Sequence, residues 1–477
     1  MNILALDIEA NGLYHPWEKE VATKIHCVCA VGNDGREFKF KGKKHLIDTL
    51  KEYDILLVHY GLNYDLPMLS KFWLVNYQIN IDILNNLYGL DTIDGVKIKI
   101  VDTLLLSKMT FPERHVHGLD DWAKVLGTFK PTINDWHNLP LEVYEHRCIE
   151  DCKTTLALFK HITESLKGWD MRKAYFIEKA FAQLIYEQVV RGVPFDEEQA
   201  RKNLEECIKL MQELEDEVLP QLPEKPIPKS RLKFPPKAKF KKTGEPSANA
   251  RKYFKEGLHE KDGTWYVGQT PLKDMNEPLV THEPMQMHST EVKTWLIETY
   301  GWKPTFWNYK KDKQGNLIKD GNGHLIRLSA RFKDEEGNLC PDLKRLGDKI
   351  ELVKKIVRWL SLRSRKNVIC SDNGTGWLNH PRLAIDGKLP AGMDTVGAIT
   401  GRVTHSGVAN VPRISSLFGQ QMRELFYARG GQLVVGCDAK GLEARTEAEN
   451  AYPYDNGACA AEVLNGDVHT KNMEAFG

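Results

Sequence analysis

The first 168 residues alternate between short apolar runs and stretches whose apolar positions recur every three or four residues. Short runs bounded by turn residues predict buried strands, and the wider spacing predicts amphipathic helices. Asn33-Asp34-Gly35 joins two of the runs and predicts a hairpin. The predicted strands are 4–9, 26–31, 36–40, 55–59 and 98–101, and the predicted helices begin at 45 and 64. Strands that alternate with helices predict an α/β domain, a mixed sheet covered by helices.

The middle of the chain has the periodicity of helices. Residues 177–185 and 197–219 predict two helices separated by Gly192 and Pro194, with Asp196 as an N-cap. Apolar residues at alternating steps of four and three then predict one long amphipathic helix: Leu346, Ile350, Val353, Val357 and Leu360. The other face of that helix is basic and includes Lys354 and Lys355, which by themselves indicate a solvated face.

Composition limits the class of protein. A length of 477 residues predicts two to four domains, and contents of 42% hydrophobic and 27% charged residues are those of a soluble globular protein. A net charge of +1 means that any nucleic-acid surface must be local. The nine cysteines lack metal-finger spacing, which favours a reducing, cytoplasmic location. The sequence has no run of 18 apolar residues and no secretion signal, so we expect no membrane partner.

One segment, at about 220–284, differs in composition from its surroundings. Between Glu224 and Glu256 there are nine Lys and two Arg against three Glu, with several prolines and interleaved aromatic residues. A solvated, partly disordered insertion explains this composition. A surface for nucleic-acid phosphates or for a protein partner explains it equally well.

Two neighbouring acids on the first predicted strand are the first candidates for chemistry. Asp7 and Glu9 are two residues apart, so they point to the same face of the strand. Adjacent carboxylates repel each other unless a cation lies between them, and a divalent metal held by oxygen ligands is such a cation. Taken alone, the pair is more simply explained as two ordinary acids on an exposed edge strand.

Further acids occupy positions that are typical of sites. Asp65 follows a buried strand where a helix begins, the usual place for a site in an α/β sheet. Asp151 lies on a later predicted helix, and His146 precedes it by five residues, about one and a half turns. His146 would lie at the helix entrance, within reach of a site that Asp151 lines. Considered singly, His146 is an exposed residue at the start of a helix.

Taken in order, D-x-E on the first strand, Y-D after a middle strand and H-x4-D on a late helix resemble the DEDD family of 3′–5′ exonucleases. The resemblance implies an RNase H-like fold in which Asp7, Glu9, Asp65 and Asp151 hold two Mg²⁺ or Mn²⁺ ions across the scissile phosphate. It also implies that His146 is the general base, because the position four before Asp151 is Arg147 and not the Tyr of the other subtype. In the family pattern an Asn often stands at the position of Tyr60, which puts substrate-strand contacts there in doubt. We expect Asp102 to be a helix cap.

A second set of motifs lies near the end of the sequence. These are 397–405 (G-A-I-T-G-R-V-T-H), 433–445 (L-V-V-G-C-D-A-K-G-L-E-A-R) and 464–472 (L-N-G-D-V-H-T-K-N). On its own the second stretch predicts a buried strand that delivers Asp438 into a turn and helix.

In this order the motifs resemble family A DNA polymerases, most closely the podovirus-type replicative enzymes related to bacterial DNA polymerase I. The resemblance implies that Asp438, assisted by the Ala439 carbonyl, binds the catalytic metals of a palm domain. Glu443 would exclude a ribose 2′-hydroxyl, and His469 would contact the incoming triphosphate. Arg402, with Lys354 and Lys355 of the basic helix, would contact primer–template DNA.

The two resemblances together define the expected domains. Residues 1–168 would form an RNase H-like α/β exonuclease, and 169–390 mostly helical linker helices and thumb, with helices near 197–219 and 343–366. The insertion at about 220–284 would take the place of a loop that binds a processivity factor. Residues 391–477 would form an incomplete α+β palm.

The sequence ends at Gly477, before the fingers helix and the second palm aspartate that the resemblance implies should follow. We therefore expect that this polypeptide alone does not polymerise DNA, since two-metal transfer needs both aspartates. The first hypothesis is a metal-dependent, proofreading-type exonuclease of a DNA replication protein, acting on single-stranded DNA in the cytoplasm, which is that of a bacterial host if the chain is phage-encoded. The second is a subunit of a split polymerase, completed by a second polypeptide that carries fingers and the remaining palm. The third is a non-catalytic DNA-binding remnant.

Overall fold

The computed structural model describes residues 1–15, 17, 22–129, 131–312, 317–334, 337–409 and 411–476, with the backbone alone at 468, 469, 472 and 475. The chain divides into two compact units, Met1–Phe426 and Tyr427–Gly477. Each is described separately below. No helix among the described residues is both long enough and apolar enough to cross a membrane.

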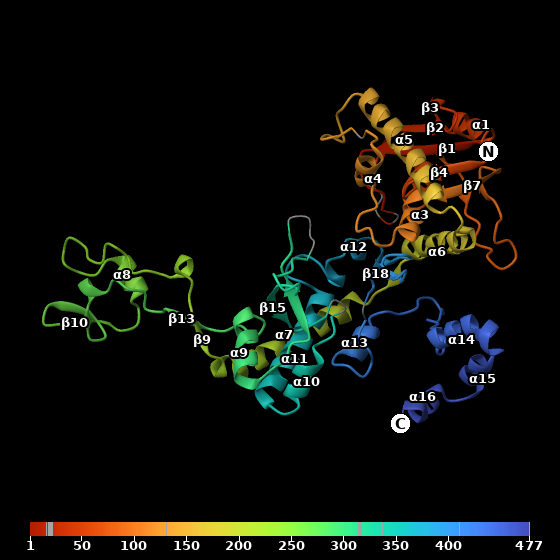
Figure 1. The fold of residues 1–477 in the computed structure, drawn as a ribbon. Coiled ribbons are helices and arrows are strands. Elements are labelled where there is room, and N and C mark those ends of the chain that lie inside the picture. The colour runs from red at the N-terminus through yellow and green to blue at the C-terminus, as the bar shows by residue number, and fades with distance from the viewer. Residues whose placement is uncertain are drawn as a thin grey trace. The chain divides into compact units, whose positions relative to one another are not determined.

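The first unit begins with a seven-stranded mixed sheet (Figure 1). Its strand order is β3-β2-β1-β4-β7-β6-β5, with β1, β4 and β7 parallel and the outer pairs antiparallel. The predicted hairpin is β2–β3. The strands are β1 (Ile3–Ala10), β2 (Ile25–Gly32), β3 (Glu37–Lys39), β4 (Ile55–Val58), β5 (Tyr77–Gln78), β6 (Asp91–Ile93) and β7 (Val96–Asp102).

Helices cover both faces of this sheet, as the alternation of strands and helices predicted. Alternate residues of β1 enter different cores: Leu4, Leu6 and Ile8 pack with α1 and α2, whereas Ala5 packs with α3, α4 and α5. Asp7 and Glu9 share the face of Ala5 because side chains alternate along a strand. The helices are α1 (Lys43–Leu50), α2 (Asp65–Trp73), α3 (Thr103–Thr110), α4 (Leu119–Leu126) and α5 (Leu141–Ser165).

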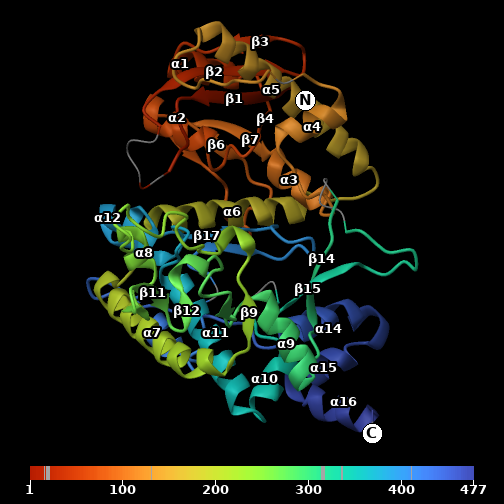
Figure 2. The same cartoon turned by 90° about the vertical axis from the view of Figure 1, so that its left-hand side faces the viewer.

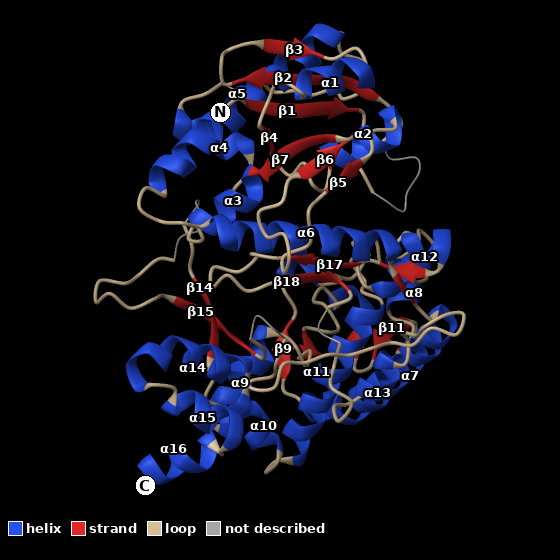
Figure 3. Cartoon of the chain, turned by 90° about the vertical axis from the view of Figure 1, so that its right-hand side faces the viewer, coloured by secondary structure: helices blue, strands red, loops and turns tan. Residues whose placement is uncertain are grey.

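Helix α6 (Arg172–Arg191) lies between the sheet and the strand β17 (Ala391–Asp394), as Figures 2 and 3 both show. Its Lys179 is fully buried and donates to both carboxylate oxygens of Asp91, at 2.9 and 2.7 Å. At the other side Gln188 donates to the carbonyl of Ala391 at 2.6 Å. The helix thus connects the sheet with the later part of the first unit.

The next part of the chain is mostly helical around two apolar clusters. Asp196 caps α7 by accepting a hydrogen bond from Gln199 N at 2.9 Å, as predicted. The long helix predicted from Leu346 is interrupted: α10 ends at Gly347, and Ile350 has an extended backbone before α11 begins. The elements are β8 (Val193–Pro194), α7 (Glu197–Val218), α9 (Thr290–Tyr300), β14 (Phe306–Tyr309), β15 (Arg327–Arg331), α10 (Pro341–Gly347), α11 (Glu351–Ile369) and α12 (Arg382–Asp386).

The basic segment folds around a small core of its own. Strands β9 and β13 pair antiparallel, and their partnership of Pro226 with His282 brings the two ends of the segment together. Between them Ala250, Phe254 and Leu272 are fully buried against one another. The elements are β9 (Glu224–Pro226), α8 (Ala248–Tyr253), β10 (Leu258–Lys261), β11 (Thr264–Val267), β12 (Thr270–Pro271) and β13 (His282–Pro284).

The first unit ends with two short strand pairs and a helix. Strand β17 pairs with β18 (Thr404–Gly407), and β16 (Lys388–Leu389) pairs with β8. Helix α13 (Gly419–Arg423) follows. The second unit contains α14 (Leu442–Asp455), α15 (Ala458–Asn465) and α16 (Val468–Phe476).

Candidate metal centre

Three of the four predicted acids converge on one face of the sheet. Carboxylate oxygens of Asp7, Glu9 and Asp151 all lie within 4.8 Å of one another. Glu9 and Asp151 are buried, and Asp7 is partly exposed. Buried carboxylates gathered this closely repel each other, so the arrangement needs a compensating positive charge. A set of acidic oxygens suits a hard divalent cation such as Mg²⁺ or Mn²⁺.

The position of this cluster follows from the register of the sheet. Strand β1 pairs with β4 only through Ile3–Ala5, so Asp7 and Glu9 lie beyond the carboxyl end of β4. On the other side β1 remains paired with β2 through Ala10. Helix α5 packs on the same face and contributes Asp151. Sites in α/β sheets form at such strand ends.

Asp65 lies beside the cluster without belonging to the close group of three. It is the first residue of α2 and only 2% exposed, and its Oδ1 has no hydrogen-bond partner. Burial raises the pKa of the Asp65 carboxyl well above its usual range, and the charges of Asp102 and Glu9 raise it further. A buried carboxylate oxygen without a donor is a place where a proton or a metal ion is bound. The residues present therefore fit a metal ion.

Asp102 stabilises the loop that leads to Asp65. It caps α3 by accepting from Leu104 N at 3.0 Å, as expected, and also accepts from the backbone of Tyr60 and Leu62, at 3.0 and 3.3 Å. Tyr60, the residue at the position of the family's Asn, has a φ of 64°. That left-handed conformation is favoured by Gly and Asn and costs a Tyr of order 1 kcal/mol.

Arg147 was not assigned a role from the sequence, yet it makes a close cationic contact to the acids. Its Nε lies 2.9 Å from Glu9 Oε1 and 3.9 Å from Asp151 Oδ2, and its guanidinium lies 5.2 Å from the Trp136 ring. The signal in the sequence is its spacing, because residues four apart on a helix share a face. Arg147 thus supplies part of the positive charge that the acids require.

His146 lies elsewhere on the helix. It is in the second turn of α5 and not at its entrance, and its side chain is exposed, with its ring 6.2 Å from that of Phe129. Residues five apart on a helix point about 140° away from each other. This explains why Asp151 is buried while His146 is not.

Tyr64, the Tyr of the Y-D motif, is a further neighbour of the acids. Its hydroxyl donates to the carbonyl of Gly12 at 3.0 Å. Burial raises the pKa of Tyr64, and the negative charges of Asp65, Glu9 and Asp7 raise it further. Tyr64 therefore remains a neutral phenol beside the acids.

The residues expected to contact primer–template DNA lie in the first unit. Arg402 is exposed in the loop between β17 and β18. Lys354 and Lys355 are paired with acids, Lys354 with Glu351 at 3.3 Å and Lys355 with Glu217 at 2.7 Å. The basic face of α11 is thus partly neutralised by its own neighbours.

The strand predicted before Asp438 is wrong for this structure. Residues 433–437 form no strand, and Leu433, Val434 and Val435 are 87%, 74% and 85% exposed. A strand needs a neighbour to satisfy its backbone groups, and no strand among the described residues pairs with this stretch.

The remaining palm candidates also belong to the second unit. Asp438 and Ala439 are exposed, and Glu443 is exposed in the first turn of α14. The backbone of His469 belongs to α16, and its side chain lies outside the described residues.

The fold and the acid cluster define an α/β protein with a candidate metal centre at a strand end. Sequence comparison identifies the related proteins more specifically. The chain is 27% identical to the DNA-directed DNA polymerase of Enterobacteria phage T3 and 26% identical to that of Escherichia phage T7, over 99% of its own length. It is thus a homologue of the phage DNA-directed DNA polymerases, which confirms the relationship recognised from its motifs.

The matched proteins are longer than this chain. The alignments cover 73% of each phage polymerase. Among solved structures, the POL domain of Pol1 from M. smegmatis, in complex with DNA primer-template and dNTP, superposes with a TM-score of 0.49 at 13% identity. That superposition covers 90% of this chain but only 55% of the other, so the chain spans about half of it. No protein-family model matches the chain.

Proposed function

We propose that this chain is a metal-dependent 3′–5′ exonuclease with an RNase H-like domain, joined to polymerase-related segments of a DNA replication protein. The observation that carries the proposal is the convergence of Asp7, Glu9 and Asp151 within 4.8 Å, with Asp65 buried beside Glu9. Bound Mg²⁺ or Mn²⁺ would supply a Lewis acid and a water of lowered pKa. The homology with phage DNA polymerases makes DNA the substrate of choice.

The acids have two kinds of part in this mechanism. Asp7, Glu9 and Asp151 offer the converging oxygen ligands, and Asp65 offers a buried oxygen that loses its proton when a cation binds. Arg147 neutralises Glu9 and Asp151 while no metal is bound. His146 keeps its proposed role as general base, which requires that the first turns of α5 rearrange when DNA binds, so that its exposed side chain reaches the acids.

A neighbouring cavity supports a single-stranded substrate. It has a volume of about 760 Å³ and shares Tyr64 with the acid site. Its lining includes Tyr14, Tyr60, Tyr186 and Lys108. Aromatic rings stack on unpaired bases, so this lining suits a frayed 3′ end. Lys108 is paired with Asp394 of the same lining.

The test uses chelator-treated full chain and a single-stranded oligonucleotide labelled at its 5′ end. With added Mn²⁺ we expect stepwise shortening from the 3′ end, reduced at least about 100-fold in Asp7→Asn and Asp151→Asn. Asp48→Asn is the matched control, since Asp48 pairs on the surface of α1 with Lys51 at 2.7 Å. Absence of Mn²⁺-dependent shortening in the unaltered chain, or equal activity in Asp7→Asn, contradicts the proposal.

A second candidate function is that of a polymerase subunit completed by another polypeptide. The observation that favours it is the exposed β-branched stretch at Val434 and Val435, which has the composition of a strand but no strand partner among the described residues. Strand addition by a second chain would bury it and fix Asp438. Coexpression with a polypeptide carrying polymerase fingers and the remaining palm should give a copurifying complex that extends primers. Failure of both copurification and extension would exclude this candidate.

A further inference from the structure

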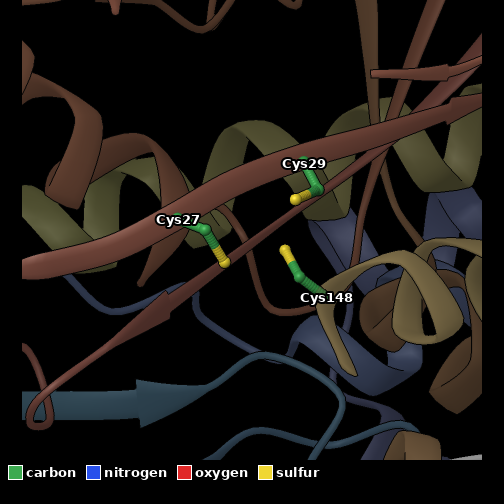
Figure 4. Close-up of side chains that lie close together, drawn as sticks. All are labelled: Cys27, Cys29 and Cys148. Carbon is green, nitrogen blue, oxygen red and sulfur yellow. The ribbon is translucent and has the colours of Figure 1, made fainter. Parts of the chain in front are cut away.

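Three cysteine side chains of the first unit converge in a group that does not include any of the four acids. Cys27 and Cys29 come from β2 and Cys148 comes from α5 (Figure 4). Their Sγ atoms all lie within 4.8 Å of one another, and the residues are 8%, 0% and 0% exposed. All three are free thiols.

The register of the sheet sets this cluster beside the acid site. Glu9 lies opposite Cys27, and Asp7 lies opposite Cys29, in the antiparallel pair β1–β2. Directly opposite residues share a face, so the thiols lie under α5 next to the acids. Cys148 donates its S–H to the carbonyl of Asp7 at 3.0 Å. Cys152, one turn further along α5, donates to the carbonyl of Cys29 at 3.6 Å and is not one of the three.

Buried cysteines often act only as small apolar side chains, and these three do contribute to an apolar core. The short distances between their sulfur atoms also suit the binding of a metal ion. Zinc–sulfur bonds of about 2.3 Å put the sulfur atoms of one coordination sphere roughly 3.8 to 4.0 Å apart. Sulfur atoms that already lie within 4.8 Å need only small rotations to reach that spacing.

We propose that Cys27, Cys29 and Cys148 form a binding site for one soft divalent metal ion of the Zn²⁺ and Cd²⁺ class, separate from the hard-metal site of the acids. Thiolate sulfur selects such ions, whereas carboxylate oxygen selects Mg²⁺ and Mn²⁺. On binding, each thiol gives up its proton to solvent and its sulfur becomes a ligand. Because Cys148 and Asp151 share one turn of α5, this site would fix α5 against β2 beside the acids.

The test is titration of the chelator-treated, fully reduced chain with Cd²⁺, monitored by the ultraviolet charge-transfer absorption of sulfur–cadmium bonds. We expect saturation at one equivalent, no displacement by excess Mg²⁺, and at least about 100-fold weaker binding in Cys148→Ala and in Cys27→Ala. Cys207→Ala is the matched control, because Cys207 is a fully buried cysteine on α7. Circular dichroism and thermal unfolding of each variant verify that it folds.

Two outcomes overturn the proposal: no charge-transfer absorption at one equivalent of Cd²⁺, or the same loss of binding in Cys207→Ala as in Cys148→Ala. The double variant Asp7→Asn/Asp151→Asn should keep the absorption unchanged. The readout does not depend on nuclease activity, so failure of the exonuclease proposal and failure of this one are distinguishable.

Discussion

Arg147 illustrates what one residue adds to a set of acids. The pair Asp7 and Glu9 could be recognised from the sequence because strand side chains alternate, and Asp151 from its place in an ordered motif. The contact of Arg147 with Glu9 could not be recognised, because it depends on how a long side chain is oriented after α5 has packed on the sheet. What can be read from the sequence is only that Arg147 precedes Asp151 by four residues.

We predict that Arg147 competes with metal ions for the acids. Arg147→Gln removes a positive charge from a partly buried position beside Glu9 and Asp151, so Mn²⁺ affinity should rise about tenfold. Electron paramagnetic resonance of free Mn²⁺ during titration measures the affinity. Arg147→Lys, which keeps the charge, should change it much less. Unchanged or weaker Mn²⁺ binding by Arg147→Gln would show that the arginine supports the metal site instead of opposing it.

At the scale of elements, local periodicity predicted β1, β2, β3, β4 and β7 of the sheet, but it predicted neither β5 and β6 nor α4. It was wrong where an element depends on distant partners. The stretch 433–437 has the composition of a strand, but no strand among the described residues pairs with it. The helix predicted from Leu346 is divided because the chain turns at Gly347–Ile350, where apolar residues happen to continue the helical spacing.

The buried pair of Lys179 and Asp91 gives a prediction about how α6 is held against the sheet. The pair could not be predicted from the sequence, because the sequence does not distinguish a buried Lys and Asp from two charged residues on the surface. Lys179→Met leaves Asp91 buried without its cation, which should lower the free energy of unfolding by about 3 to 5 kcal/mol. Chemical denaturation measures the change.

Lys173→Met on the same helix is the control, because Lys173 is exposed and its loss should cost less than about 0.5 kcal/mol. The double variant Asp91→Asn/Lys179→Met should regain part of the stability, as it removes the unpaired charge. Equal effects of Lys179→Met and Lys173→Met would mean that the pair contributes nothing to the attachment of α6.

On the scale of the whole molecule, the homology with phage polymerases says least about the role of the segment between β9 and β13. Its composition predicted either a disordered insertion or a binding surface, and the structure gives it a small core around Phe254. A segment with its own core and closely spaced ends can be removed without breaking the elements on either side. Between 224 and 256 the segment carries nine Lys and two Arg against three Glu.

We predict that this charge binds DNA phosphates outside the nuclease site. Replacing 227–281 with a short Gly-Ser linker, which joins the paired ends of β9 and β13, should leave cleavage of a short single strand unchanged. It should weaken binding to a long primer–template and make that binding less dependent on salt, since each lost phosphate contact removes about 0.9 from the logarithmic salt slope. Fluorescence anisotropy at several salt concentrations measures both quantities. An unchanged slope would refute a phosphate-binding role and leave a protein partner, such as a processivity factor, as the ligand of this surface.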